Sequence, residues 1–156
     1  MADPANETVI APFTSFNFSV EINRTGQSDQ LVSAAFSECD GLEMTMDVKT
    51  IREGGNNGQQ IRLTGPFNFG QVTLKRGMTN NFDLWDWVTE TLHNPSMRAD
   101  AEVVVLAGDR QTKRASFVLS RCLPVKLKAP PLNAKDGTIA IEELQLAYES
   151  LTLKKS

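Results

Sequence analysis

The stretch from residue 40 to residue 77 constrains the fold most, because two strand-like patterns flank a segment that cannot belong to a core. Apolar and polar side chains alternate at its start, as in a strand with two different faces. The apolar positions are Met44, Met46 and Val48, and the polar ones are Thr45, Asp47 and Lys49. We expect the apolar positions to face the core of the protein.

A polar, glycine-rich arm separates the two strand-like patterns. It consists of Arg52, Glu53, Gly54, Gly55, Asn56, Asn57, Gly58, Gln59 and Gln60. Glycine and asparagine favour turns and offer little apolar surface to bury, so the arm is predicted to be extended and exposed. Alternation returns after it, where Val72 and Leu74 are interleaved with Gln71, Thr73 and Lys75.

The length of 156 residues fits a single domain, predicted over residues 1–156, with residues 1–12 as a mobile N-terminal segment and residues 52–60 as the arm. No apolar run approaches the roughly 20 residues of a membrane helix. The first residues lack the basic start and apolar stretch of a signal peptide, so we expect synthesis in the cytoplasm without one, and no stable insertion into a membrane.

Charge and cysteine content exclude further classes. The formal net charge of −3, from 16 basic and 19 acidic residues, argues against nucleic acid as the main ligand. Cys39 and Cys122 lack metal or redox spacing and are predicted to be free, half-buried thiols.

The rest of the chain predicts a mainly β protein with one helix. Strand patterns cover residues 16–22, 32–39, 102–107, 114–122 and 139–153. The last of these changes its apolar phase twice, so we expect it to serve two surfaces or to wrap around a corner. Pro124 is expected to mark a strand edge.

The helix is predicted between Asn81, a candidate N-cap, and Asn94, which precedes a proline. Its core face is expected to carry residues spaced near 3.6, namely Phe82, Trp85, Val88 and Leu92. Leu84 and Trp87 form a second apolar face. Either both faces pack within one protomer, or a neighbouring subunit covers the second face, which makes Leu84 and Trp87 candidates for a subunit interface.

Residues for catalysis do not assemble into a site. His93 is the single histidine and lies at the predicted helix end, so no nucleophile–histidine arrangement can be built. The glycines of the arm are not followed by the lysine and helix of a phosphate loop. We therefore predict no enzyme activity, no metal and no cofactor, and expect the function to lie in a surface.

Four segments in order resemble the tail tube proteins of contractile phage tails and related contractile injection systems. They are residues 16–22, residues 36–42, residues 53–56 followed by 72–77 and the helix that contains Trp85 and Trp87, and residues 141–149. Together these segments extend over nearly the whole chain.

The resemblance implies two packed antiparallel sheets in a sandwich or barrel-like fold, with a flanking helix. It also implies hexameric rings that stack into a hollow tube within a contractile sheath, with strands from all subunits closing a shared inner barrel. The implied partners are further copies of the chain, the sheath protein, the baseplate and spike hub, the tape measure and terminal cap proteins, and cargo in the lumen, without recognition of a nucleic-acid sequence.

Within this scheme we expect Val72 and Leu74, with the three apolar residues before the arm, to face the protomer core. The candidate lumen-facing residues are Thr45, Asp47, Lys49, Gln71, Thr73 and Lys75. The arm, together with residues 1–12, is predicted to order when rings stack. Two alternatives remain open from the sequence: a ring-forming tube protein of type VI secretion, and a monomeric β-sandwich that binds carbohydrate or peptide.

Overall fold

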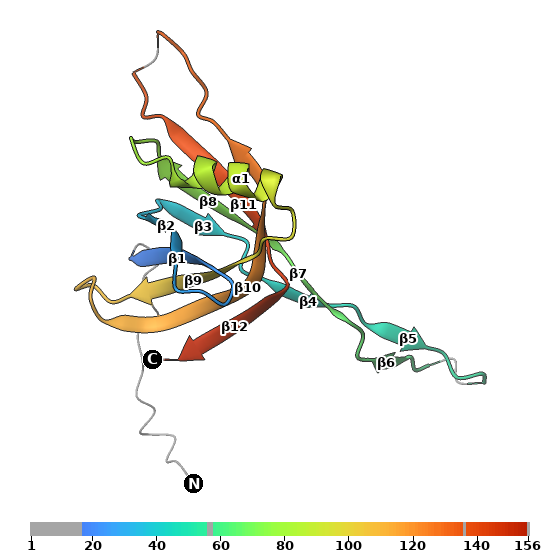
Figure 1. Ribbon diagram of the computed structural model, residues 1–156. Helices are drawn as coiled ribbons and strands as arrows, with labels where there is room; N and C mark the ends of the chain where they lie inside the picture. The colour runs from blue at the N-terminus through green and yellow to red at the C-terminus, as the bar shows by residue number, and fades with distance from the viewer. Residues whose placement is uncertain (1–16, 56–57, 136, 156) are drawn as a thin grey trace.

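The structure is a computed structural model that describes residues 17–55, 58–135 and 137–155, without the side chains of residues 33 and 34 (Figure 1). The predicted N-terminal segment, residues 1–12, lies outside the described residues. The elements are β1 (Phe18–Arg24), β2 (Gln30–Ala34), β3 (Glu38–Asp40), β4 (Met44–Met46), β5 (Lys49–Ile51), β6 (Ile61–Leu63), β7 (Phe67–Phe69), β8 (Gln71–Gly77), α1 (Asp83–His93), β9 (Ala99–Leu106), β10 (Lys113–Lys128), β11 (Ile141–Ala147) and β12 (Ser150–Lys155).

The body of the protein consists of two antiparallel sheets that share one strand. Sheet A contains β2, β1, β9, the first part of β10 and β12, and sheet B contains the last part of β10, β11, β8 and β3. The helix α1 lies beside the two sheets in Figure 1. The predicted fold class, mainly β with antiparallel sheets and one flanking helix, is confirmed.

The strand that joins the sheets is β10, which bends between its two halves. Arg121 has a positive φ of 53°, and the register shifts between Leu119 and Cys122 and again between Pro124 and Lys126. Such bulges bend a strand and turn it toward a new partner. The prediction that a strand ends at residue 122 was wrong, because β10 continues to Lys128, past a bulge that follows Pro124.

The C-terminal strand pattern, residues 139–153, is divided in the structure. Its first part is β11 in sheet B and its last part is β12 in sheet A, with Tyr148 and Glu149 between them. The expectation that this stretch serves two surfaces is therefore confirmed. The expectation of one continuous strand was wrong, because the chain passes from one sheet to the other at the break.

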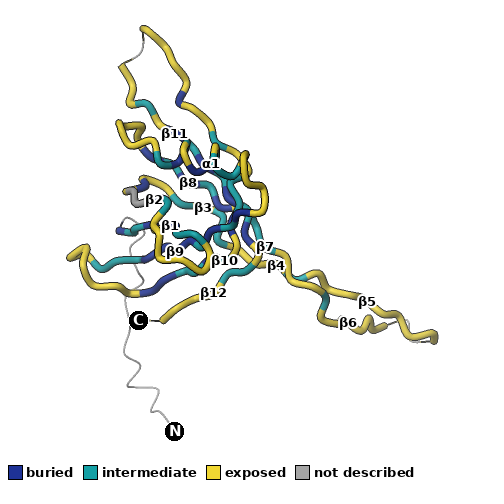
Figure 2. Tube along the Cα trace, in the orientation of Figure 1, coloured by how far each residue is buried: buried dark blue, intermediate teal, exposed yellow. Residues whose placement is uncertain are grey.

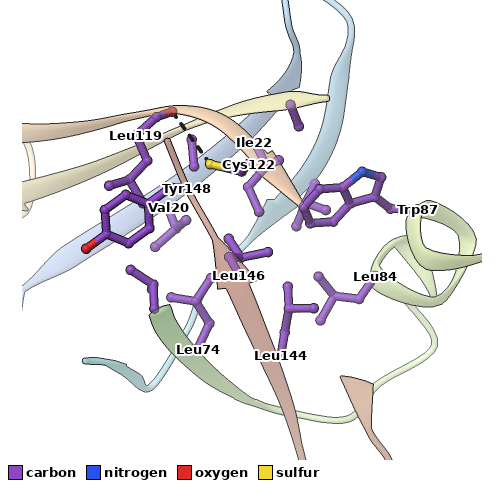
Figure 3. Packing of buried hydrophobic residues seen from close by; sticks show 14 of the residues in the cluster. Val20, Ile22, Leu74, Leu84, Trp87, Leu119, Cys122, Leu144, Leu146 and Tyr148 are labelled. Carbon is purple, nitrogen blue, oxygen red and sulfur yellow. Dashed lines mark hydrogen bonds between the residues drawn. The ribbon is translucent and has the colours of Figure 1, made fainter. Parts of the chain in front are cut away.

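The core lies between the two sheets and α1 (Figure 3). Val72 and Leu74 on β8 are buried as predicted. The other large buried side chains include Val20, Ile22, Leu119, Leu144 and Leu146 from both sheets and Leu84 and Trp87 from α1. The residues of β8 and β11 alternate between this core and the opposite face, as strand geometry requires.

The helix turns a different face to the core than the 3.6-residue pattern suggested. Leu84 and Trp87 are almost completely buried against their own chain, whereas Phe82 is 50% and Leu92 is 76% exposed. The proposed use of Leu84 and Trp87 as a subunit interface was therefore wrong, and both pack within the protomer. Asn81 precedes the N-cap residue Phe82, and its Oδ1 accepts a hydrogen bond from the backbone N–H of Asp83 at 3.2 Å.

A buried ion pair explains which helix face turns inward. Arg76 on β8 donates from Nε to Glu142 Oε1 on β11 at 2.5 Å and from Nη2 to Asp83 Oδ1 on α1 at 2.6 Å. Trp85 Nε1 donates to the second oxygen of Glu142 at 3.0 Å. These bonds hold the helix by Asp83 and Trp85, so the side chains of Leu84 and Trp87 are directed into the core.

The charges of this cluster compensate each other. Burial by itself lowers the pKa of Arg76, but the hydrogen bonds to Glu142 and Asp83 outweigh it and raise the pKa above the ordinary arginine value. The guanidinium also lies 5.7 Å from the centre of the Phe36 ring. Because a buried charge that loses its partner is costly, the cluster makes stability depend on Glu142.

We expect Glu142→Gln to lower the free energy of unfolding by roughly 3 kcal/mol, because Arg76 would keep its charge while losing one of two carboxylate partners. Urea denaturation followed by tryptophan fluorescence measures the change. Glu143→Gln is the matched control, since Glu143 points to the opposite, half-exposed face of β11, and its change should stay within about 0.5 kcal/mol. Equal effects of the two substitutions would contradict this role of the ion pair.

Candidate assembly surfaces

A two-stranded ribbon, residues 44–69, extends from the body and ends in the polar arm (Figure 1). Its strands pair as β4 with β7 and as β5 with β6, with Thr45 opposite Asn68 and Thr50 opposite Arg62. The arm joins β5 to β6 at the tip of the ribbon. Asn56 and Asn57 lie outside the described residues, and the described residues of the arm are exposed. The predicted arrangement of strands around an exposed arm is thus present.

The base of the ribbon is attached to the body by Tyr148. Its hydroxyl accepts a hydrogen bond from the backbone N–H of Glu43 at 3.2 Å and lies 3.0 Å and 2.9 Å from the carbonyl oxygens of Gly41 and Glu43. The ring of Phe69 packs against the Tyr148 ring with 5.8 Å between centroids. Gly41 has a φ of 101°, and a Cβ there would collide with the carbonyl of Gln71, so only glycine fits.

The ribbon exposes apolar side chains. The expectation that Met44 and Val48 face the core was wrong, since Met44 is 55% exposed and Val48 is also exposed, while Met46 is half-buried. The reason is that β4 pairs with β7 outside the body instead of joining either sheet. The large exposed apolar residues of the ribbon are Met44, Val48, Ile51, Ile61, Leu63 and Phe67. Figure 2 shows this exposure along most of the ribbon.

Such an apolar surface on a projecting element indicates a contact with another molecule. Opposite residues of an antiparallel pair lie on the same face, so Met46 lies beside Phe67, and Ile51 lies beside Ile61. A two-stranded ribbon alone gains little stability in water. The ribbon is therefore a candidate assembly surface.

The outer face of sheet B, which points away from the core, is the second candidate surface. Gln71 is exposed and Thr73 and Lys75 are half-exposed on β8. The structure thus brings these three predicted lumen residues together. The other three, Thr45, Asp47 and Lys49, are exposed on the ribbon and do not belong to this face.

Sequence reasoning missed other side chains of this outer face. The strand register adds Glu143 and Gln145 on β11, Lys126 and Lys128 on β10, and Glu38 and Asp40 on β3. The alternation of residues 141–147 was a signal for the first two. The other four follow only from the pairing of β10 and β3, which the sequence does not specify.

The described residues contain no group of three or more histidine, cysteine, aspartate or glutamate side chains placed to hold a metal ion. His93 lies exposed at the end of α1. In the same part of the chain, no helix has the length and apolar character needed to cross a membrane.

The two thiols are free, as predicted, and Cys39 is half-buried. The expectation that Cys122 is also half-buried was wrong, because it is fully buried in the core, with its Sγ 3.6 Å from the carbonyl oxygen of Leu119. Burial raises the pKa of Cys39 to about 11, and the nearby charge of Asp40 adds to this. Burial raises the pKa of Cys122 to about 12. Both residues therefore hold their protons at neutral pH.

We expect both thiols to react slowly with Ellman's reagent at pH 8, because the thiolate is the nucleophile and about one Cys39 in a thousand would carry it. The rate at Cys39 should rise about tenfold per pH unit below its pKa. A Cys39→Ser variant assigns the remaining signal to Cys122, and unfolding in urea should make both thiols react quickly. A native rate equal to the unfolded rate would contradict the raised pKa values.

The protein is a β-sandwich with two surfaces suited to contacts between subunits, namely the exposed polar face of sheet B and the projecting apolar ribbon. Residues 14–152 match the family described as T4-like virus tail tube protein gp19. The chain belongs to this family, which confirms its resemblance to tail tube proteins. Tail tube formation is thus its function class, in place of a monomeric binding module.

Solved structures agree with this assignment. A chain in the baseplate structure of the anti-feeding prophage is similar at 26% identity and a TM-score of 0.83, over 94% of this chain and 97% of that one. A chain in the sheath–tube complex of the extracellular contractile injection system PVC shares the fold at 18% identity and a TM-score of 0.81, with full coverage of both.

A further solved structure shares the fold less closely. Hcp1 from Flavobacterium johnsoniae is similar at 13% identity and a TM-score of 0.50, over 88% of this chain and 96% of that one. Comparison with the sequences of curated proteins finds no match.

Proposed function

We propose that the chain forms hexameric rings, that the rings stack into a hollow tube, and that contraction of a surrounding sheath drives this tube through a target envelope. The observation that carries the proposal is the family match over residues 14–152. The exposed ribbon supports it, because a protein that remained monomeric would leave the apolar side chains of that element in water. In this role the protein is structural and not catalytic.

The outer face of sheet B is proposed to line the lumen. It is polar, with Gln71, Thr73, Gln145 and charged side chains of both signs, whereas the opposite face of the same strands is packed into the core. A face of this kind adheres weakly to a passing cargo. Thr45, Asp47 and Lys49 lie on the ribbon and not on this face. We propose that they face the lumen only where the ribbon contacts the lumen-lining face of a neighbouring ring.

We expect Thr73→Cys, in a Cys39→Ser background, to react in assembled tubes with a small maleimide but not with a maleimide attached to a large polymer. The polymer would be excluded from a narrow channel. Lys154→Cys is the control, because Lys154 is exposed on β12 in sheet A and should react with both reagents. Equal labelling of Thr73→Cys by both reagents in tubes would contradict a lumen position.

The arm and ribbon are proposed to connect successive rings. The arm lies at the tip of an element that extends away from the body (Figure 1). Its polar residues cannot form a core of their own, while the apolar pairs of the ribbon need a covering surface. A neighbouring ring would supply that surface.

Deletion of residues 56–59 should leave a folded protein that forms single rings but few long tubes. Negative-stain microscopy and circular dichroism measure assembly and fold. Replacement of the same residues by Gly-Ser-Gly-Ser is the control for loop length, and it should restore tubes only if the sequence of the arm is unimportant. Normal long tubes from the deletion variant would show that the arm does not connect rings.

The proposed partners follow from this role. The similar chains come from structures of a baseplate, a sheath–tube complex, a tube-terminating cap and a sheath–tube terminator. We propose that this chain likewise contacts a sheath, a baseplate with its spike hub and a terminal cap, together with a tape measure protein and a cargo. Two of these structures belong to an extracellular contractile injection system, which favours an injection particle over a phage tail.

A further inference from the structure

A polar cavity of about 320 Å³ lies where three parts of the fold meet. Its lining comes from the end of β1 and the turn after it, from the connection between α1 and β9, and from the bend of β10. The lining residues are Arg24, Thr25, Gln27, Asn94, Ser96, Met97, Arg98 and Arg121. None of the described residues that line it is an aspartate or a glutamate. The cavity is therefore rich in positive charge and in hydrogen-bond donors.

Two of the three guanidinium groups have carboxylate partners that do not line the cavity. Arg24 forms an ion pair with Glu90, and Arg121 Nε lies 3.0 Å from Glu149 Oε2. The backbone N–H of Arg121 also donates to Asp100 Oδ1 at 3.1 Å, and the same oxygen accepts a bond from a hydroxyl of the lining. These bonds fix the two arginines in place and compensate part of their charge.

The third guanidinium group, that of Arg98, keeps unused hydrogen-bonding capacity. It forms no ion pair with any described residue, and its Nη1 donates to the carbonyl oxygens of Pro95 and Met97 at 2.9 Å each. Its Nε is buried and has no hydrogen-bond partner among the described residues, which is costly for a charged group. The residue as a whole is half-exposed, so a ligand in the cavity can reach the guanidinium. An acceptor bound there would remove this cost.

The donors of the cavity suit an oxyanion. A guanidinium group binds a carboxylate or a phosphate through parallel N–H groups, and neighbouring arginines favour an anion with several oxygens. Neutral donors add to them: Asn94 Oδ1 accepts a bond from Ser96 Oγ at 2.9 Å, which leaves the NH₂ group of Asn94 to donate. The described lining residues include no aromatic side chain on which a base or a sugar ring would stack.

We propose that this cavity binds a small oxyanion of the phosphate or carboxylate class, held between Arg24, Arg98 and Arg121. The bound anion would connect the end of α1, the turn after β1 and the bend of β10, and would thereby stabilise the junction of the two sheets. Its source is either free phosphate or a carboxylate group of a partner protein. This inference does not depend on the proposed ring assembly.

Titration of the full chain with sodium phosphate at pH 7 tests the proposal. Isothermal titration calorimetry at constant ionic strength should show saturable binding. Phosphate at ten times its Kd should raise the Tm by about 4 °C. Because phosphate also stabilises proteins without binding to a site, the effect must be compared between variants.

Arg98→Gln should weaken phosphate binding at least tenfold, because charge-assisted hydrogen bonds are lost. Arg110→Gln is the matched control, since Arg110 is exposed on the turn after β9 and does not line the cavity. Its affinity should stay within about twofold of the wild type.

A second substitution serves if circular dichroism shows that loss of the Arg98 bonds unfolds the chain. Gln27→Glu places a carboxylate on an exposed lining residue, where it should compete with phosphate and also weaken binding at least tenfold. Gln111→Glu makes the same change in charge on the turn after β9, outside the lining, and should leave the affinity unchanged.

A tetraglutamate peptide with blocked ends is the second probe and distinguishes the sources of the anion. Tighter binding of phosphate identifies a free anion as the ligand, whereas tighter binding of the peptide identifies a carboxylate of a partner protein. The proposal is overturned if the wild type binds neither probe saturably. It is also overturned if the folded cavity variants bind as tightly as their controls.

Discussion

The bend of β10 is the constraint on which the rest of the fold depends. One strand of 16 residues pairs with β9 and β12 before the bend and with β11 after it. The positive φ of Arg121 and the bulge at Pro124 allow this change of partners, and the backbone N–H of Arg121 is satisfied by Asp100 Oδ1 at 3.1 Å. Without the bend the two sheets would have no common strand.

The bend also explains why sheet B ends at β10 in the part of the chain that the structure describes. The first half of β10 has neighbours on both sides, whereas the second half has moved away from β9 and β12 and pairs, among the described strands, only with β11. Protein sheets with exposed edges need protection or a partner. In the proposed tube, further copies of the chain would be available to cover this edge.

Much of the fold was predictable from local patterns. The alternation of Val72 and Leu74 with polar residues placed β8 correctly, and the turn-forming residues of the arm placed the tip of the ribbon. The helix orientation was not predictable, because α1 is apolar on two faces and the deciding contacts of Asp83 and Trp85 are with Arg76 and Glu142 on distant strands. Likewise, Met44 alternates like a core residue, and only its pairing with Phe69 outside the body shows that it is exposed.

The position of Tyr148 has a mechanical consequence. This residue lies where the chain leaves β11 for β12, and it holds the base of the ribbon through Gly41, Glu43 and Phe69. A force that pulls on the ribbon therefore enters the body at the junction of both sheets rather than at a loose loop. Tension would be shared between the hydrogen bonds of β11 and those of β12. In a tube under axial load, each subunit would therefore resist as one unit instead of losing a single strand.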